Sequence, residues 1–114
     1  MGDERAAVLQ GTLELLILKV ISLEPIHGWG ITQRLEQMSG QVLQVNQGSL
    51  YPALERLGRG GWIRSEWRTT ESNRRARFYV VTAAGRRRLA AEQAGWQRAS
   101  AAVNAILAWS GALP

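Results

Sequence analysis

The chain has 114 residues, a formal net charge of +5, 46% apolar and 20% charged residues, which fits one globular domain with a modest core. It has no cysteine and one histidine, which excludes a disulfide framework, a thiolate nucleophile, a cysteine zinc site and a two-histidine metal motif. No uninterrupted apolar run reaches about 18 residues and the charged residues 1–5 lead into no signal-peptide pattern, so a cytoplasmic protein without a membrane span is expected.

The first predicted element is a helix over residues 8–23. Its apolar residues recur at helical spacing, and Thr12 or Gln10 supplies a polar start. Pro25 ends the helix, because the proline ring restricts the residue before it and forbids continuation. Residues 25–28 are predicted as a turn.

Two further helices follow. Apolar residues at helical intervals predict a helix over 28–39, and Gly40 suits the left-handed position after its end. The third helix is predicted over 47–58. We expect Ser49, or a residue just before it, as its N-cap, because Pro52 lacks an N–H and is tolerated in the first turn.

The next elements are extended. Residues 41–45 alternate weakly and predict a short extended connector before the third helix. Residues 62–68 alternate and residues 76–82 are aromatic and β-branched, which predicts two strands. The polar residues 69–75 between them predict a hairpin with a basic tip.

A long helix is predicted over residues 83–109, capped by Thr82. Its roughly 27 residues would extend about 40 Å, more than a small domain can cover. An apolar stripe with seven-residue spacing runs along it, formed by Leu89, Trp96, Val103, Ala99 and Ile106. Such an uncovered stripe is typical of a surface that pairs with another helix.

The positive charge is concentrated in one third of the chain. Residues 56–88 hold ten arginines and two glutamates, whereas the rest holds four basic and seven acidic residues. Arginine pairs in a bidentate manner with phosphate and with guanine edges, so this segregation favours nucleic-acid binding over a merely solvated surface.

Three helices, a hairpin and a long final helix predict a mainly α fold with a small β-hairpin: a winged helix-turn-helix over 1–82, a dimerisation helix over 83–110 and a tail over 111–114. The chain resembles the PadR-like transcriptional regulators over residues 8–107. The resemblance is carried by GSLYPAL at 48–54, RL at 56–57, GWI at 61–63, NRRARFY at 73–79 and TAAGRR at 82–87, with LLIL from 15 and HGWG at 27–30. The short C-terminal part resembles the compact subgroup with one helix after the wing.

The DNA-contacting residues are expected on the third helix and the hairpin. The start of a helix offers N–H groups to phosphate, and the resemblance implies backbone contacts at Ser49 and Tyr51; a cap and a core residue are the alternative. Gln47, Glu55 and Arg56 are candidates for base edges. The arginines of the hairpin suit a narrow minor groove, unless they only keep the loop soluble; they are Arg74, Arg75 and Arg77.

The last helix carries a candidate effector site. The resemblance implies that a tryptophan eleven residues after the glycine of the Thr-x-x-Gly motif lines a pore at the dimer interface and stacks on flat aromatic ligands; here that residue is Trp96. A ligand-free packing residue in the dimer seam is the alternative. The interface would also include Leu89, Val103 and Ile106.

Other side chains have simpler expected roles. Trp29 and Trp62 are expected in the core and Trp67 half-buried on the hairpin, and His27 is expected to serve helix packing. The arginines 86–88 begin the last helix, where cations oppose its dipole; they would meet either DNA or an acidic surface that includes Glu14.

The expected function is a homodimeric DNA-binding repressor that reads a pseudo-palindromic operator with helix 47–58 and wing 69–77. A small aromatic effector at the dimer interface is the expected candidate for relieving this repression. The alternative is a winged-helix module that binds a protein and does not read DNA. An enzyme is not expected, because the sequence shows no metal set, no phosphate-binding glycine loop and no paired carboxylates. No cofactor and no metal are expected.

Overall fold

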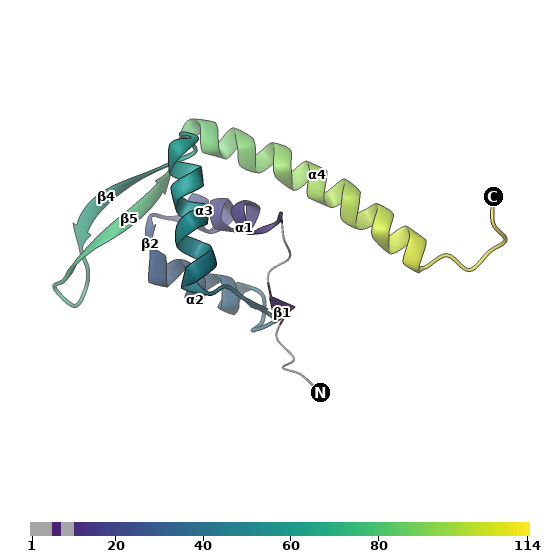
Figure 1. Ribbon diagram of the computed structural model, residues 1–114, viewed down its shortest axis with the longest axis horizontal. Helices are drawn as coiled ribbons and strands as arrows, with labels where there is room; N and C mark the ends of the chain where they lie inside the picture. Colours follow the sequence, from purple (N-terminus) through teal and green to yellow (C-terminus); the bar gives the residue numbers. More distant parts are fainter. Residues whose placement is uncertain (1–5, 8–10) are drawn as a thin grey trace.

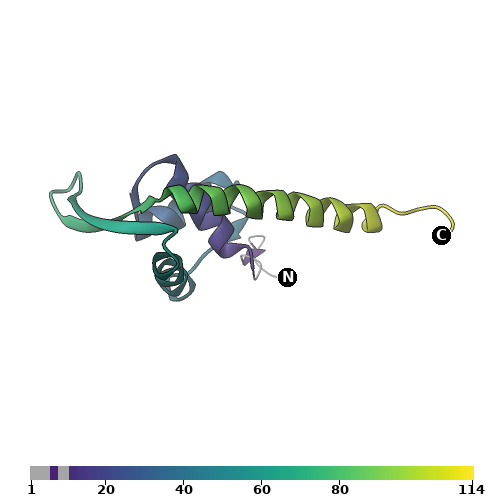
Figure 2. The ribbon, with the colours of Figure 1, turned by 90° about the horizontal axis from the view of Figure 1, so that it is seen from above.

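The computed structural model describes residues 6–7 and 11–114 and consists of a small helical body with two projections. The elements in chain order are β1 (Ala6–Ala7), α1 (Leu13–Leu23), β2 (Ile26–His27), α2 (Gly28–Met38), β3 (Leu43–Gln44), α3 (Gln47–Arg59), β4 (Ile63–Thr69), β5 (Arg75–Val81) and α4 (Ala83–Leu107). The β4–β5 hairpin, which we call the wing, and α4 extend from the body in opposite directions (Figures 1 and 2). The molecule is therefore elongated, with extents of 62 × 37 × 21 Å.

The core lies where α1, α2, α3 and the base of the wing meet. Its buried members are Ile17, Leu18, Val20, Ile21, Ile26, Ile31, Leu35, Leu50, Ala53, Leu54, Leu57, Ile63, Tyr79 and Val81. Each helix contributes residues three or four apart, which is the spacing of one helical face. Trp62 and Leu89 pack against the edge of this cluster, so the core position expected for Trp62 is confirmed in part.

The predicted turn at 25–28 is partly wrong, because Ile26 and His27 form strand β2. This strand pairs antiparallel with β5, with Ile26 opposite Tyr79 and His27 opposite Phe78. Two extended residues after Pro25 fit beside the free edge of β5 and convert the hairpin into a three-stranded sheet. The side chain of His27 also caps α2, since its Nδ1 accepts a hydrogen bond from the Gly30 N–H at 3.0 Å.

Helix α3 begins at Gln47, as predicted, but its cap is not Ser49. Asn46 is the N-cap, and its Oδ1 accepts a hydrogen bond from the Ser49 N–H at 2.8 Å. Pro52 consequently lies beyond the first turn, inside the helix. The carbonyl of Gly48, which Pro52 cannot engage, belongs to an exposed residue, where water can bind it.

Helix α1 begins at Leu13, later than the predicted start at residue 8, because Gly11 (φ 89°) and Thr12 form a turn before it; residues 8–10 lie outside the described part of the chain. The other boundaries follow the sequence closely. Gly40 adopts a left-handed conformation after α2 with φ of 64°, and the extended residues Leu43–Gln44 lie within the predicted connector and pair parallel with β1. Asn73 (φ 60°) forms the tip of the wing within the predicted turn. Helix α4 is capped by Thr82, whose Oγ1 accepts from the Gly85 N–H at 3.0 Å.

Two tryptophans do not lie where the sequence predicted. Trp29, expected in the core, is 58% exposed, and Trp67, expected half-buried, is 61% exposed. The neighbours of Trp29 in α2, Gly28 and Gly30, occupy the buried positions instead. Apolar spacing therefore identified the buried Ile31 and Leu35 but gave the wrong side for Trp29 at the start of α2.

Candidate nucleic-acid interface

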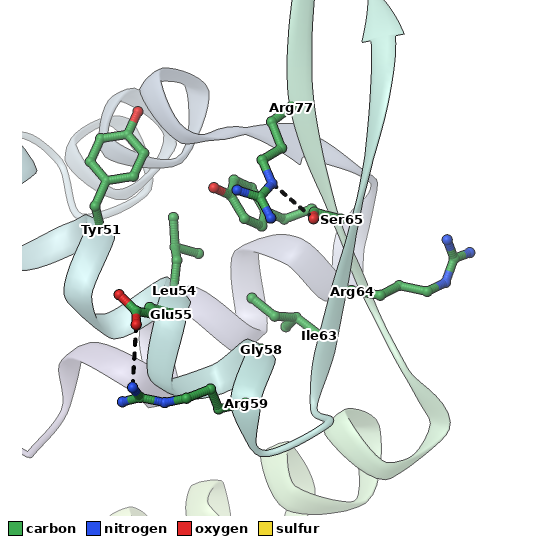
Figure 3. A pocket seen from close by; sticks show the side chains of 10 residues that line it. Tyr51, Leu54, Glu55, Gly58, Arg59, Ile63, Arg64, Ser65 and Arg77 are labelled. Carbon is green, nitrogen blue, oxygen red and sulfur yellow. Dashed lines mark hydrogen bonds and ion pairs between the residues drawn. The ribbon is translucent and has the colours of Figure 1, made fainter.

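A groove of about 630 Å³ separates α3 from the wing (Figure 3). We call it the α3–wing groove; it is lined by Tyr51, Leu54, Glu55, Gly58, Arg59, Ile63, Arg64, Ser65, Arg77 and Tyr79. Helix α3 supplies one wall through residues three or four apart in sequence, and residues 63–65 of β4 with Arg77 and Tyr79 of β5 supply the other. The apolar floor belongs to the core, so the groove has a fixed shape.

Arg77 is the cation that the wing presents to this groove. Its Nε donates to the Ser65 Oγ at 2.9 Å across the strand pair, which fixes the guanidinium over the groove (Figure 3). Tyr79 lies one alternation further along β5, and burial raises the pKa of its hydroxyl although Arg77 acts in the opposite direction. The guanidinium of Arg64 points away from the groove (Figure 3).

A second hollow of about 500 Å³ lies between the start of α2 and the tip of the wing. Its lining residues from the wing include all three predicted arginines, Arg74, Arg75 and Arg77. Tyr51 lines both this hollow and the α3–wing groove. A Cβ on Gly28 would lie 2.7 Å from the Tyr51 hydroxyl, so the glycine lets this ring rest against the start of α2.

The structure brings part of the predicted set of DNA-contacting residues to the two hollows. Gln47 and Ser49 are exposed in the first turn of α3, and Tyr51 follows with 45% of its surface exposed. Arg75 lies over the exposed Trp67 ring, 5.9 Å from the ring centroid. Of the predicted residues, Tyr51, Glu55, Arg74, Arg75 and Arg77 line the two hollows, whereas Gln47 and Ser49 line neither.

Arg56 departs from this arrangement. Its Nε lies 3.5 Å from a carboxylate oxygen of Glu14 in α1, so the side chain is directed away from the groove. Glu14 also lies 4.0 Å from Arg88, which stacks 3.7 Å above the Trp62 ring and pairs with Glu92. For Arg88 the acidic-surface alternative therefore agrees with the contacts, while Arg86 and Arg87 are exposed.

The opposite face of the wing carries a separate charge cluster. Glu66 lies between Arg64 and Arg68, and hydrogen bonds from Arg68 and then Arg64 lower the pKa of its carboxyl. Arg68 lies over the Phe78 ring at 5.5 Å, and His27 meets the edge of that ring at 5.3 Å. Arg64 and Arg68 are thus paired with a carboxylate, whereas Arg77 donates to a serine hydroxyl and Arg75 lies over an aromatic ring, so both keep their positive charge uncompensated by these contacts.

Sequence reasoning missed Arg59, Ser65 and Tyr79 as groove residues. Arg59 follows Tyr51 by eight residues, two steps of four on one helix face, and this periodicity could have revealed it. Ser65 shares its strand face with Ile63, so alternation contained that signal as well. The cross-strand pairing with Tyr79 depends on register, which the sequence does not fix.

A second candidate surface lies on α4. Trp96 is 43% exposed and borders a hollow of about 310 Å³, which is lined by Gly11, Thr12, Leu15, Arg88, Glu92, Gly95, Trp96 and Ala99. Val103 and Ile106 are exposed further along the helix, with Leu107 and Trp109 beside them. Leu89 instead packs against the core of its own chain.

Within residues 6–7 and 11–114, no group of three or more potential metal ligands is present. None of the helices described there is long and apolar enough to cross a membrane.

This combination of a three-helix body, a wing and a basic groove defines a winged helix-turn-helix of the DNA-binding class. The family model of the PadR-like transcriptional regulators matches residues 17–91. The chain therefore belongs to the PadR-like family of transcriptional regulators. The family consists of regulators rather than enzymes, as the sequence predicted.

Solved structures with the same fold agree. A PadR-like transcriptional regulator from Bacillus cereus is 27% identical, with a TM-score of 0.78, over 90% of this chain and 97% of that one. A PadR family transcriptional regulator from Eggerthella lenta is 28% identical, with a TM-score of 0.75, over 89% of this chain and 86% of that one.

Curated relatives are similar over comparable stretches. A 37.1 kDa protein in a transposon of Streptomyces fradiae is 34% identical over 90 residues, which are 79% of this chain and 24% of that protein. A protein from Lysinibacillus sphaericus is 22% identical over 82 residues, which are 72% of this chain and 75% of that protein. The match thus spans about a quarter of the first of these relatives.

Proposed function

We propose that the protein is a homodimeric, cytoplasmic repressor that reads a pseudo-palindromic operator. Residues 1–82 form the DNA-binding unit and residues 83–110 the dimerisation helix. The observation that carries the proposal is the α3–wing groove, where Tyr51 on the helix faces Arg77 on the wing. Helix α3 enters the major groove, and the wing reaches the neighbouring phosphates or minor groove.

The roles of individual residues follow from this placement. Gln47 and Tyr51 lie at the exposed start of α3, near the positive end of the helix dipole. Asn46 already accepts from the Ser49 N–H, so Ser49 would meet phosphate through its hydroxyl. Arg74, Arg75 and Arg77 neutralise backbone charge from the wing. Arg56, directed toward Glu14, contributes to the positive field rather than to base contacts.

The dimer rests on the exposed apolar stripe of α4. Val103 and Ile106 are 55% and 73% exposed, which favours burial against a second copy. Two copies related by a two-fold axis would contact half-sites about 34–36 Å apart, one helical turn of DNA. If the operator overlaps a promoter, the bound dimer excludes polymerase, which is the form of repression proposed here.

Fluorescence anisotropy with labelled DNA from the gene's own upstream region, against scrambled DNA, tests the proposal. A protein making roughly 6–10 phosphate contacts loses about 10³–10⁵ in affinity between about 50 and 200 mM salt. We expect binding of the native sequence to survive at about 150 mM salt and binding of scrambled DNA to vanish. Equal binding of both would contradict sequence readout. A reporter gene behind that region should be silenced by the protein; increased expression would contradict repression.

An effector site beside Trp96 is a finer part of the proposal. The exposed indole and the adjoining hollow of about 310 Å³ support stacking of a flat aromatic molecule. An effector that binds more tightly to the DNA-free geometry of the dimer than to the DNA-bound geometry would weaken DNA binding. Binding of a flat aromatic dye such as a bisbenzimide should be lost in Trp96→Ala, and equal uptake by wild type and variant would exclude this site.

A further inference from the structure

Glu55 is the one carboxylate among the residues that line the α3–wing groove. Its side chain is 69% exposed and sits one turn after Tyr51 and one turn before Arg59. It therefore occupies the middle of the helix stripe that faces the groove (Figure 3). A negative charge at this point is unexpected on a surface that binds a polyanion.

The contact that Glu55 makes within the chain is weak. Its Oε1 lies 3.2 Å from Nη1 of Arg59, and both side chains are 69% exposed. An exposed ion pair between residues four apart stabilises a helix by only about 0.3–0.5 kcal/mol. Glu55 can consequently exchange Arg59 for another hydrogen-bond donor at little cost, and Arg59 is then available to phosphate.

The adjacent arginine cannot take this position. Arg56 is directed toward Glu14 on the other side of α3. Of these two neighbours in sequence, only Glu55 lines the groove. The groove therefore receives a hydrogen-bond acceptor from this part of α3 and not the guanidinium of Arg56.

The chemistry of DNA limits what a carboxylate can meet there. Phosphates repel it, and the major-groove edges offer hydrogen-bond donors only at the amino groups of cytosine and adenine. The adenine amino group is flanked by the N7 acceptor, which opposes a second carboxylate oxygen, whereas cytosine N4 has no such neighbour on its own base. A carboxylate left without a donor in the interface carries a large desolvation cost.

We propose that Glu55 is a specificity-determining residue that accepts a hydrogen bond from one cytosine in each half-site. This inference rests on the proposed function, because it requires α3 to enter the major groove. It adds a base preference that arises largely by penalising thymine and guanine at that position.

The test is in vitro selection from a randomised duplex library with the full-length protein, followed by anisotropy on the selected duplex. Wild type should select cytosine at one position per half-site, and replacement of that cytosine should weaken binding about tenfold. Glu55→Gln should lose this preference and favour adenine there, because glutamine pairs with adenine. Glu55→Ala should accept all four bases within about twofold.

Glu24→Gln is the matched control. Glu24 is also an exposed carboxylate paired with an arginine, Arg34, but it lies at the end of α1 and outside the groove. Its replacement changes the net charge by the same amount and should leave the cytosine preference intact.

The outcomes separate this inference from the proposed function. If Glu55→Gln keeps the cytosine preference and gains affinity for all duplexes as Glu24→Gln does, Glu55 is only a repelling charge and the inference is overturned. A selected operator without a cytosine preference overturns it as well, and leaves the proposed function standing. Failure of wild type to select any sequence overturns both. Circular dichroism melting of each variant excludes unfolding as the cause.

Discussion

Two glycines of α4 have very different surroundings. A Cβ on Gly85 would lie 2.0 Å from the Trp62 carbonyl oxygen and 2.8 Å from a methyl group of Val81. A Cβ on Gly95 would meet nothing closer than 3.9 Å. Gly85 thus permits the close approach by which the first turn of α4 packs on the base of the wing.

This contrast predicts opposite effects of the same substitution. Gly85→Ala should lower the free energy of unfolding by about 2–3 kcal/mol, because backbone must move to admit the methyl group. Gly95→Ala should raise it by up to about 1 kcal/mol, because alanine favours an exposed helix. Urea denaturation measures both, and equal effects would contradict the packing described for Gly85.

Gly28 offers a way to displace Tyr51 without altering it. In Gly28→Ala the new methyl group would lie 2.7 Å from the Tyr51 hydroxyl, and the half-exposed ring can swing aside. We expect stability to change by less than about 1 kcal/mol and DNA affinity to fall severalfold, measured by denaturation and anisotropy. In a Tyr51→Phe background Gly28→Ala should have a smaller effect; an undiminished loss would mean that the glycine acts by another route.

At the scale of elements, the wing divides its arginines between two faces. Arg77 faces the groove, so Arg77→Gln should weaken binding of all sequences similarly and reduce the slope of log affinity against log salt by about one. Arg34→Gln removes an arginine that is paired with Glu24 outside the groove and should leave the slope unchanged. Equal slopes for wild type and Arg77→Gln would remove Arg77 from the phosphate contacts.

The charge cluster around Glu66, on the face of the wing opposite the groove, predicts that stability depends on pH. Since the pKa of Glu66 is lowered in the folded state, its ion pairs stabilise the wing above the ordinary carboxyl pKa of 4.5. That contribution is lost as the pH falls through the lower folded-state pKa. The melting temperature of wild type should therefore exceed that of Glu66→Gln near neutral pH and approach it in acid. A gap between the two that persists in acid would assign the stabilisation to other groups.

The elements also show what sequence could predict. Helix α4 and the hairpin were predicted to within two residues at each end, because their patterns are local: Thr82 as a cap and alternation at 62–68. Strand β2 was missed because its existence depends on the edge of β5, more than 50 residues away in sequence. Helix α3 begins at Gln47 as predicted, but the cap expected at Ser49 is wrong: Asn46 caps the helix, and Pro52 is accommodated beyond the first turn.

The candidate site divides in the same way. Tyr51 was predicted from the start of the third helix and the family resemblance, and the arginines of the wing from charge; all of them line the two hollows. The direction of Arg56 depends on Glu14, which only the fold brings near. Trp29 was placed in the core because its size favours burial, but two glycines beside it permit the tight packing that the indole would prevent.

For the whole molecule, the proposed dimer rests on the end of α4. Val103→Glu combined with Ile106→Glu places charge on the exposed stripe and should yield a monomer in sedimentation experiments. DNA affinity should fall about a hundredfold or more, because two linked half-site contacts become independent. Ala94→Glu with Ala101→Glu adds the same charge to the opposite helix face and should remain dimeric. A dimer that survives the first pair would place the interface elsewhere.

The shape of α4 gives small movements a large effect. A straight helix of 25 residues is about 37 Å long, and its first turn is fixed to the base of the wing by Thr82 and Gly85. If its far end is held by a second copy, a tilt of about 10° there moves the DNA-binding unit at the other end through about 6 Å. That displacement is nearly two base-pair steps of about 3.4 Å. The helix would then act as a lever arm. A side-chain rearrangement in the proposed α4–α4 interface would be enough to bring the two DNA-binding units of the dimer into or out of register with DNA.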